Sequence, residues 1–205
     1  ALIALDSARA QGLLQRLETG LADTANSVNL LFDAPSVLAR FENKGVVPPD
    51  ICRRFGIVGI PARAAGIPQD IRLSHPAGIY RFAQIPLSTW DTGDVFARAY
   101  VRWLEIQHSI QFIREQTKAL PGGNTIAPLG PLKPDHFVVS LVEGWRGEIA
   151  HVALTNAQGN VRRHKIVDPS FHNWTALAYA LRGQQISDFP LCNKSFNLSY
   201  CGHDL

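Results

Sequence analysis

The stretch DTGDVFARAYVRWLEIQHSIQFIREQTKALPGG, residues 91–123, carries the pattern on which our fold prediction depends. Its apolar residues recur at three- and four-residue steps, which predicts a helix from about Asp94 to Ala119. The segment DTGD supplies capping groups and an acidic first turn that suits the helix dipole. The segment LPGG ends the helix at Leu120. The fold prediction therefore starts from one long helix.

A polar stripe runs along this predicted helix. It consists of Arg98, Arg102, Glu105 and Ser109, at positions i, i+4, i+7 and i+11. Such spacing is typical of a solvated helix face with internal ion pairs, and on spacing alone we favour that interpretation. The alternative is a polar seam that is buried beside a reaction centre.

A second long helix is predicted near the N-terminus. Asp6 or Ser7 can cap its start, and Pro35 limits its end because it excludes the preceding residue from the helical region. Its apolar stripe consists of Ala10, Leu14, Leu17, Leu21, Ala25, Val28 and Leu31.

Between these helices, residues 43–92 are dense in glycine and proline, which argues against long regular elements. A loop of this length is uncommon inside a compact domain unless it is functional. Several isoleucines interrupt its polar sequence. We therefore expect an ordered loop that is pressed against other elements.

The last third of the chain changes to the alternation that is typical of strands. Residues 136–144, 148–155 and 161–167 predict three short strands, joined through GWRG and NAQGN. A short helix should follow, capped by Ser170 and ended by Gly183. Two long helices with a small antiparallel sheet make an α+β fold, mainly helical. We expect one domain, with a helical part in residues 1–120 and the sheet, short helix and tail in residues 121–205.

Composition places the chain among globular proteins. Of its 205 residues, 46% are hydrophobic and 18% are charged, which allows a core and argues against extensive disorder. The net charge of +3 is mild, and we expect the basic run RRHK at 162–165 to be a solvated strand edge, not a nucleic-acid site. No apolar run approaches the roughly 20 residues that span a bilayer. The start at Ala1 and the lack of methionine predict a piece of a longer protein.

The cysteines are candidates for metal ligands. Three cysteines are too few for a disulfide framework and favour a reducing interior. Cys192 and Cys201 are separated by eight residues, unlike the close pairs of zinc and iron–sulfur sites. Cys201 and His203 could converge, but further ligands would have to come from far away. The residues themselves therefore argue against a metal site.

Self-sufficient catalytic motifs are missing. The chain has no phosphate-binding P-loop, no dinucleotide fingerprint, no zinc-protease motif and no nucleophile elbow. Arg146 and Glu148 flank a glycine at a strand junction. They are expected to fix the hairpin by charge-assisted hydrogen bonds, with orientation of a partner or cofactor as the alternative.

Several motifs in order resemble one family. They are GIVGIPARAAGIPQDIR, then Pro76, Tyr80 and Pro86, then GDVFARAYVRWLEIQHSI, VEGWRGEIAH and DPSFHNW. Together they resemble the large subunit of energy-converting nickel–iron hydrogenases and its relative, the 49 kDa subunit of complex I. The resemblance covers nearly the whole chain but only the C-terminal portion of the family's longer members. The closing tail is most similar to the hydrogenase-4-like branch.

The resemblance implies a function in redox-coupled ion transfer with a quinone or quinone-like acceptor, within an NADH:quinone oxidoreductase- or hydrogenase-like complex. It implies docking between an iron–sulfur small subunit, which holds a cluster, and membrane-arm subunits, on the cytoplasmic face of the membrane. It also gives weight to eight candidate catalytic residues that match the family pattern. These are Arg63, Asp70, Arg72, Arg98, Arg102, Glu105, Arg146 and Glu148.

The family's nickel motif, D-P-C-x-x-C, does not match the tail. Aligned on its flanks, the motif places its two thiolates at Ser199 and Gly202, with Cys201 between them. Serine and glycine cannot replace bridging thiolates, so we expect no nickel and no cofactor bound by this fragment. Two alternatives stay open: an active hydrogenase subunit with Cys192 and Cys201 as unusual ligands, or a non-catalytic assembly module. A helix face left bare by a missing domain would favour dimerisation.

Overall fold

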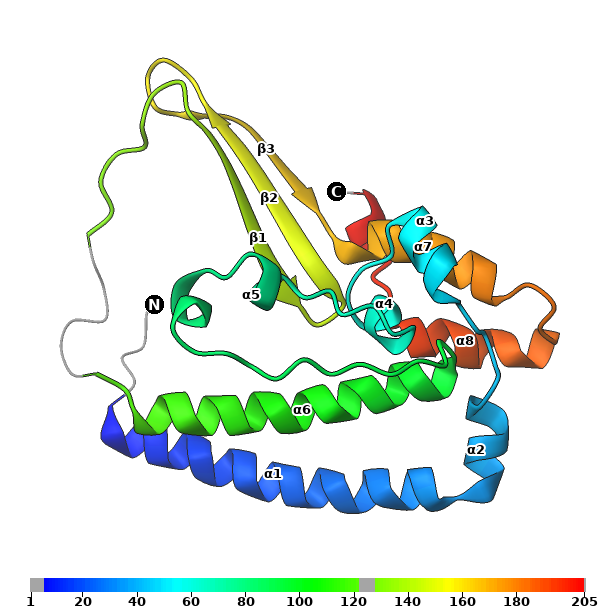
Figure 1. Ribbon diagram of the computed structural model, residues 1–205. Coiled ribbons are helices and arrows are strands. Elements are labelled where there is room, and N and C mark those ends of the chain that lie inside the picture. The colour runs from blue at the N-terminus through cyan, green and yellow to red at the C-terminus, as the bar shows by residue number, and fades with distance from the viewer. Residues whose placement is uncertain (1–5, 122–127, 205) are drawn as a thin grey trace.

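The structure, a computed structural model, describes residues 6–121 and 128–204, without the side chains of residues 203 and 204. Two long helices, α1 (Ser7–Asp33) and α6 (Val95–Lys118), lie side by side (Figure 1). Ring contacts join them, because Phe32 of α1 packs edge-on against Phe96 and Tyr100 of α6 at centroid distances of 5.4 and 5.5 Å. The prediction of two long helices is therefore confirmed, and the structure shows that they pair.

Asp94 fixes the start of α6 as the sequence predicts. Its carboxylate accepts hydrogen bonds from the backbone N–H of Ala97 at 2.8 Å, from the Thr92 hydroxyl at 2.9 Å and from the backbone N–H of Asn43 at 2.9 Å. Only 3% of its surface is exposed. This one side chain therefore caps the helix and holds the preceding loop to it.

Asp94→Ala is expected to lower the free energy of unfolding by about 2 kcal/mol, because it removes a buried helix cap. Chemical denaturation followed by circular dichroism measures the loss. Asp6→Ala is the matched control. Asp6 caps α1 through the N–H of Arg9 but is exposed, and its loss should cost about 0.5 kcal/mol. Equal costs at the two positions would contradict this account of Asp94.

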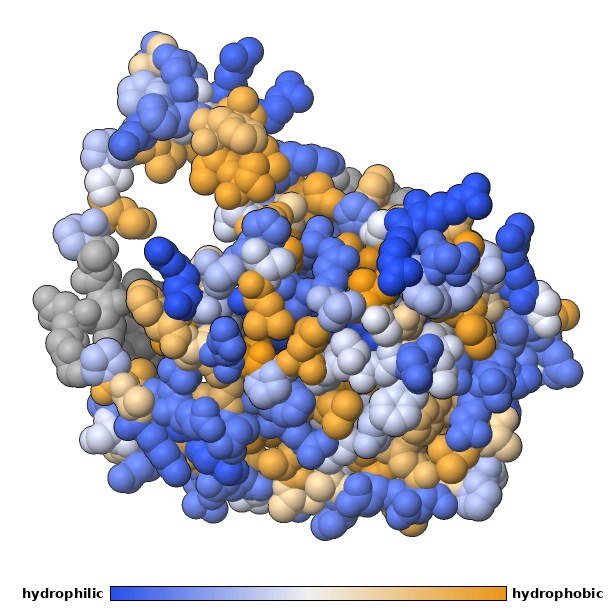
Figure 2. Space-filling view, viewed as in Figure 1, coloured by the Kyte–Doolittle hydropathy of each residue, from blue (hydrophilic) through white to orange (hydrophobic). Residues whose placement is uncertain are grey.

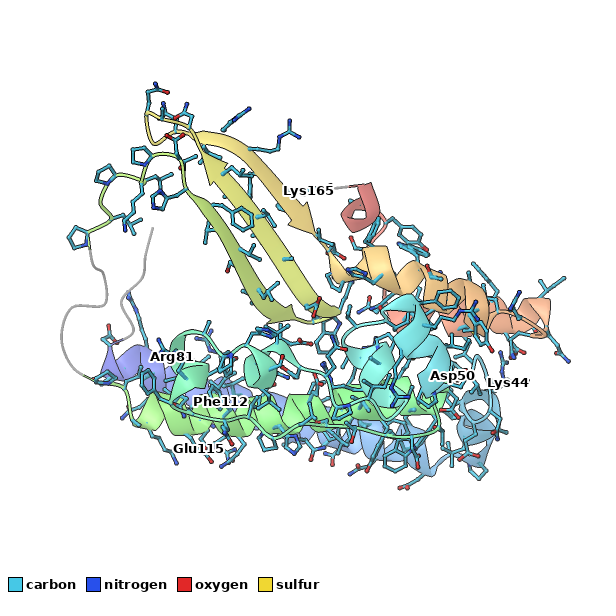
Figure 3. All side chains as sticks on the ribbon, turned by 45° about the horizontal axis from the view of Figure 1, so that its top comes forward. Lys44, Asp50, Arg81, Phe112, Glu115 and Lys165 are labelled. Atoms are coloured by element: carbon cyan, nitrogen blue, oxygen red, sulfur yellow. The ribbon has the colours of Figure 1, made fainter. Side chains whose placement is uncertain are left out.

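Residues 43–92 are more regular than the sequence predicts. Instead of one loop, they contain three short helices and a 3-10 turn: α3 (Pro49–Phe55), α4 (Ile60–Ala64), α5 (Ile71–Ser74) and η1 (Gly78–Arg81), preceded by α2 (Pro35–Phe41). The expectation that this stretch is pressed against other elements is confirmed, since α4 is entirely buried. Farther along, Tyr80 stacks on Phe112 of α6 at 5.5 Å, and Figure 3 shows Phe112 beside this loop.

A glycine allows α4 to approach the sheet. Gly59 has φ 67°, a conformation that favours glycine, and a Cβ there would lie 2.4 Å from the carbonyl oxygen of Arg146 and 2.4 Å from Cα of Gly147. The turn between the first two strands therefore sits directly on the start of α4. This contact brings residues of the loop and of the sheet together.

The three predicted strands are confirmed as β1 (Phe137–Gly144), β2 (Gly147–Thr155) and β3 (Val161–Val167), in an antiparallel sheet of order β1-β2-β3. The sheet projects from the helical body (Figure 1). Its outer part keeps apolar side chains at the surface, with Phe137 64%, Val138 58% and Val139 47% exposed (Figure 2). The end near the β1–β2 turn contacts the body.

The chain ends in α7 (Pro169–Ala180), η2 (Ile186–Asp188), α8 (Phe189–Phe196) and η3 (Cys201–Asp204). Asp168, not Ser170 as predicted, caps α7 by accepting from the N–H of Ser170. The sequence patterns predict no element in the tail after α7, where the structure has one α-helix and two 3-10 turns. The main core lies between α3, α6, α7 and α8, where Cys52, Val95 and Phe196 are buried. None of the helices in the described residues is long and apolar enough to cross a membrane.

Candidate functional site

A buried cluster of charged side chains surrounds Arg63, which lies on α4 and is fully buried. Its guanidinium nitrogens lie 2.9 Å from Oε1 of Glu143, 2.8 Å from Oε1 of Glu105 and 3.6 Å from Oδ2 of Asp70. These carboxylates come from β1, from α6 and from the residue before α5. Segments distant in sequence therefore meet at one cation.

Arg72 completes this charge cluster. It forms two parallel hydrogen bonds to Asp70, from Nε at 2.9 Å and from Nη2 at 2.6 Å. Asp70 also caps α5 by accepting from the N–H of Arg72. Burial alone would raise the pKa of Asp70, but the hydrogen bonds from Arg72 and the charges of Arg63 and Arg72 together lower it. Asp70 is therefore a fixed anion.

Glu143 behaves in the opposite way. Its Oε1 accepts from Arg63 and its Oε2 accepts from the backbone N–H of Ile71 at 3.2 Å, and its side chain is only 4% exposed. Burial raises the pKa of Glu143, and the attraction of Arg63 offsets only part of that effect. The ion pairs of the cluster join two arginines, Arg63 and Arg72, to three carboxylates, so protonation of Glu143 would balance the charges that are directly paired.

A cavity of about 370 Å³ opens beside the charge cluster. Its polar lining includes Arg72, Glu105 and Glu143, and its apolar lining includes Ile106, Ile110 and Trp145. A smaller cavity of about 100 Å³ also touches Arg72 and Glu143 and reaches His75 and Tyr80. A titratable carboxyl with a raised pKa that borders two cavities is a candidate proton carrier.

The first two members of the polar stripe on α6 lie apart from the charge cluster and hold α8. Arg98 is 1% exposed and donates to Ser195 Oγ at 2.9 Å and to the carbonyl oxygens of Gly93 and Gly45 at 2.8 and 3.0 Å. Burial lowers the pKa of Arg98 to about 9. The solvated-face interpretation is wrong here, because α8 covers this side of α6.

Arg102 continues the attachment of α8. It donates to the carbonyl oxygens of Ser195 at 2.6 Å and Phe196 at 3.1 Å, where the helix ends. Burial lowers the pKa of Arg102 to about 10, and the charge of Glu105 opposes that shift. Both arginines therefore position the tail relative to α6, whereas Glu105, one turn along, belongs to the charge cluster.

Arg146 and Glu148 do not form the predicted pair. In the part of the chain that the structure describes, no ion pair joins them. Arg146 Nε instead donates to the carbonyl oxygen of Asn197, in the tail. Its role is to hold the tail against the β1–β2 turn, while Glu148 lies on β2 outside the charge cluster.

Comparison with known proteins identifies the family. The family model described as respiratory-chain NADH dehydrogenase, 49 kDa subunit, matches residues 7–131 and 125–204, which is nearly all of the described chain. The chain belongs to this family. The resemblance seen in the sequence motifs is thus confirmed for the complex I and hydrogenase lineage.

The relatives of this chain include both hydrogenases and NADH-quinone oxidoreductases by name. The chain is 33% identical to the carbon monoxide-induced hydrogenase of Rhodospirillum rubrum, over 91% of this chain and 51% of that protein. It is 30% identical to formate hydrogenlyase subunit 5 of Escherichia coli, over 84% and 30%. It is also 30% identical to an NADH-quinone oxidoreductase subunit of Desulfotalea psychrophila, over 74% and 42%. The chain therefore spans about half or less of the length of these relatives.

A solved structure confirms the fold. A chain of the membrane-bound sulfane sulfur reductase, described as an archaeal respiratory membrane complex, superposes with a TM-score of 0.89. The match covers 97% of this chain and 56% of that chain, at 22% identity. The two chains therefore share the mainly helical α+β architecture.

Ser199 and Gly202 are the two positions of the tail that the sequence analysis aligned with nickel-binding thiolates. At the two aligned thiolate positions, Ser199 Oγ accepts from the N–H of Gly202 at 3.0 Å, and a Cβ on Gly202 would lie 2.5 Å from Cγ of Asp168. Cys192 is buried and Cys201 is exposed. Among the described side chains, no group of three or more histidine, cysteine, aspartate or glutamate residues could hold a metal; His203 lies outside this set.

Proposed function

We propose that the chain is part of a quinone-linked subunit of a complex I-like or hydrogenase-4-like complex, in which redox chemistry drives ion transfer without nickel. The observation that carries this proposal is Glu143, a buried carboxyl with a raised pKa beside a cavity and within ion-pair distance of Arg63. The mismatch of Ser199 and Gly202 with the thiolate motif supports the absence of nickel.

Proton movement follows from the charge balance of the cluster. When electron transfer in the complex adds negative charge nearby, the pKa of Glu143 rises further and its carboxylate takes up a proton from water in the adjoining cavity. Arg63 and the N–H of Ile71 hold the carboxyl in place in both states. Asp70 keeps Arg72 fixed, so the proton moves while the arginines do not.

The proposed partners are an iron–sulfur small subunit, which supplies electrons through its cluster, and membrane-arm subunits that carry the ion. The family membership supports this arrangement, because relatives are named as subunits of formate hydrogenlyase and of NADH-quinone oxidoreductase. We place the protein at the cytoplasmic face of the membrane, as a peripheral part of such a complex. Quinone is the proposed electron acceptor.

The test uses the intact complex with the full-length subunit. Glu143→Gln should slow quinone-coupled proton translocation by about tenfold or more, since it removes a proton-transfer group. Quinone reduction and proton uptake are measured together in proteoliposomes. Glu148→Gln is the matched control, because Glu148 stands opposite Glu143 in the β1–β2 register but outside the charge cluster, and it should retain coupled activity.

Elemental analysis of the same preparation decides between the open alternatives. The proposal expects iron from the partner subunit and no stoichiometric nickel. Nickel at one atom per complex, with hydrogen uptake, would establish an active hydrogenase. If Glu143→Gln kept its coupled activity, Arg63 and its carboxylates would have a purely structural role. If the wild-type complex did not reduce quinone, the subunit would be better explained as a non-catalytic assembly module.

A further inference from the structure

Two histidines of the sheet lie in contact, away from the charge cluster. His151 is on β2 opposite Ile166, and His164 is on β3 opposite Ala153, so the two are diagonal neighbours on one face. Strand alternation turns Glu143 to the other face of the sheet. The pair therefore takes no part in the proton-transfer site proposed above.

The geometry of this histidine pair is close. His151 Nδ1 lies 3.1 Å from His164 Nε2, and the ring centroids are 5.2 Å apart with planes tilted by 32°. Such a distance requires something between the nitrogens: either one shared proton or a cation bound to both. If both nitrogens bound one zinc ion at about 2.1 Å without changing their separation, the N–Zn–N angle would be about 95°.

That angle lies between the 90° of square-planar or octahedral coordination and the tetrahedral angle. An opening of the nitrogen separation by about 0.3 Å would reach the tetrahedral value that zinc prefers. His164 is exposed and His151 is half-buried, so the imidazoles can make this small adjustment while water completes the coordination. Ala153, directly opposite His164, has only a methyl side chain.

We propose that His151 and His164 form a binding site for a divalent transition-metal cation such as Zn²⁺ or Cu²⁺. Neutral imidazole is a ligand for these metals and not for Mg²⁺ or Ca²⁺. The hydroxyl of Ser140, opposite His151 on β1, is the nearest polar group of that strand on the same face. Strand alternation puts no carboxylate of β1, β2 or β3 on this face, so the site depends on the imidazoles.

Protons compete with the metal for this pair. Both ring nitrogens must be unprotonated to bind a metal ion, so added acid should release the metal. Binding should join β2 to β3 and stabilise the projecting sheet, because the unfolded chain lacks the paired geometry.

The experiment titrates the purified chain with ZnCl₂ at pH 7.5 by isothermal calorimetry, with histidine side-chain NMR as the site-specific readout. We expect one zinc per chain, shifts of the His151 and His164 imidazole signals, and a raised Tm. His151→Ala and His164→Ala should each weaken binding at least about tenfold, since a one-histidine site loses the chelate. His172→Ala, on α7, is the control and should bind as the wild type does, and MgCl₂ should give no shifts.

His164→Gln protects the test against loss of folding, because glutamine keeps a hydrogen-bonding side chain of similar size but is a poor ligand for these metals. Its sheet should remain intact by circular dichroism while zinc binding is lost. Zinc affinity that is unchanged in all three pair variants would overturn the proposal, as would the absence of any imidazole shift at about 1 mM zinc. The pair would then hold only a shared proton.

Discussion

Replacing Arg63 by methionine is expected to lower the free energy of unfolding by about 3–5 kcal/mol, the usual cost of removing one partner from a buried ion pair. The guanidinium faces Glu105, Glu143 and Asp70, and the side chains of Glu143 and Asp70 are 4% and 1% exposed. Methionine fills similar volume but leaves these carboxylates close together without their shared cation. Urea denaturation followed by circular dichroism measures the loss.

A surface arginine provides the control for Arg63→Met. Arg114 lies 3.7 Å from Glu18, with side chains 32% and 52% exposed, and Arg114→Ala should cost less than about 1 kcal/mol. If Arg63→Met does not fold, Arg63→Lys can be used, since it keeps the charge but not the planar fork and should lose part of the stability. A cost for Arg63→Met no larger than that of Arg114→Ala would contradict the central role of this arginine.

The long elements could be predicted because each carries its own periodic signal. The apolar stripe of α1 and the capped start of α6 gave boundaries within two residues of those observed. The strands were found by alternation and by their turns. The short helices of residues 43–92 were missed because each has four to seven residues, about two turns or fewer, and tertiary contacts stabilise them.

The candidate site could be predicted only in part. The family motifs indicated Arg63, Asp70 and Arg72, but no local pattern indicated Glu143, because its partner Arg63 is 80 residues away in sequence. The signal available was its place inside the family motif VEGWRGEIAH, from which only Arg146 and Glu148 were singled out. Spacing also failed to reveal that Arg98 is buried, since Ser195 of α8, to which it donates, lies 97 positions later.

Asp70 and Glu143, two carboxylates of the charge cluster, should change the free energy of unfolding with pH in opposite directions. The pKa of Asp70 is lowered on folding, so its ion pairs contribute stability above its ordinary pKa of 3.8, and that contribution is lost as the pH falls through the lower folded value. Asp70→Asn should therefore cost about 3 kcal/mol at neutral pH, and the cost should shrink only in strong acid.

Glu143 should show the opposite trend, because its pKa is raised on folding. Its contribution is fully present below its ordinary pKa of 4.5 and is lost as the pH rises through the folded value, where ionisation charges a buried group. Relative to the wild type, Glu143→Gln should therefore gain stability as the pH rises from 4.5, while Asp70→Asn stays equally destabilised over the same range. Denaturation curves of the three proteins at several pH values between about 3 and 8 measure both differences. Parallel pH profiles for the two variants would mean that Glu143 stays ionised, and the charge balance on which proton transfer depends would then be wrong.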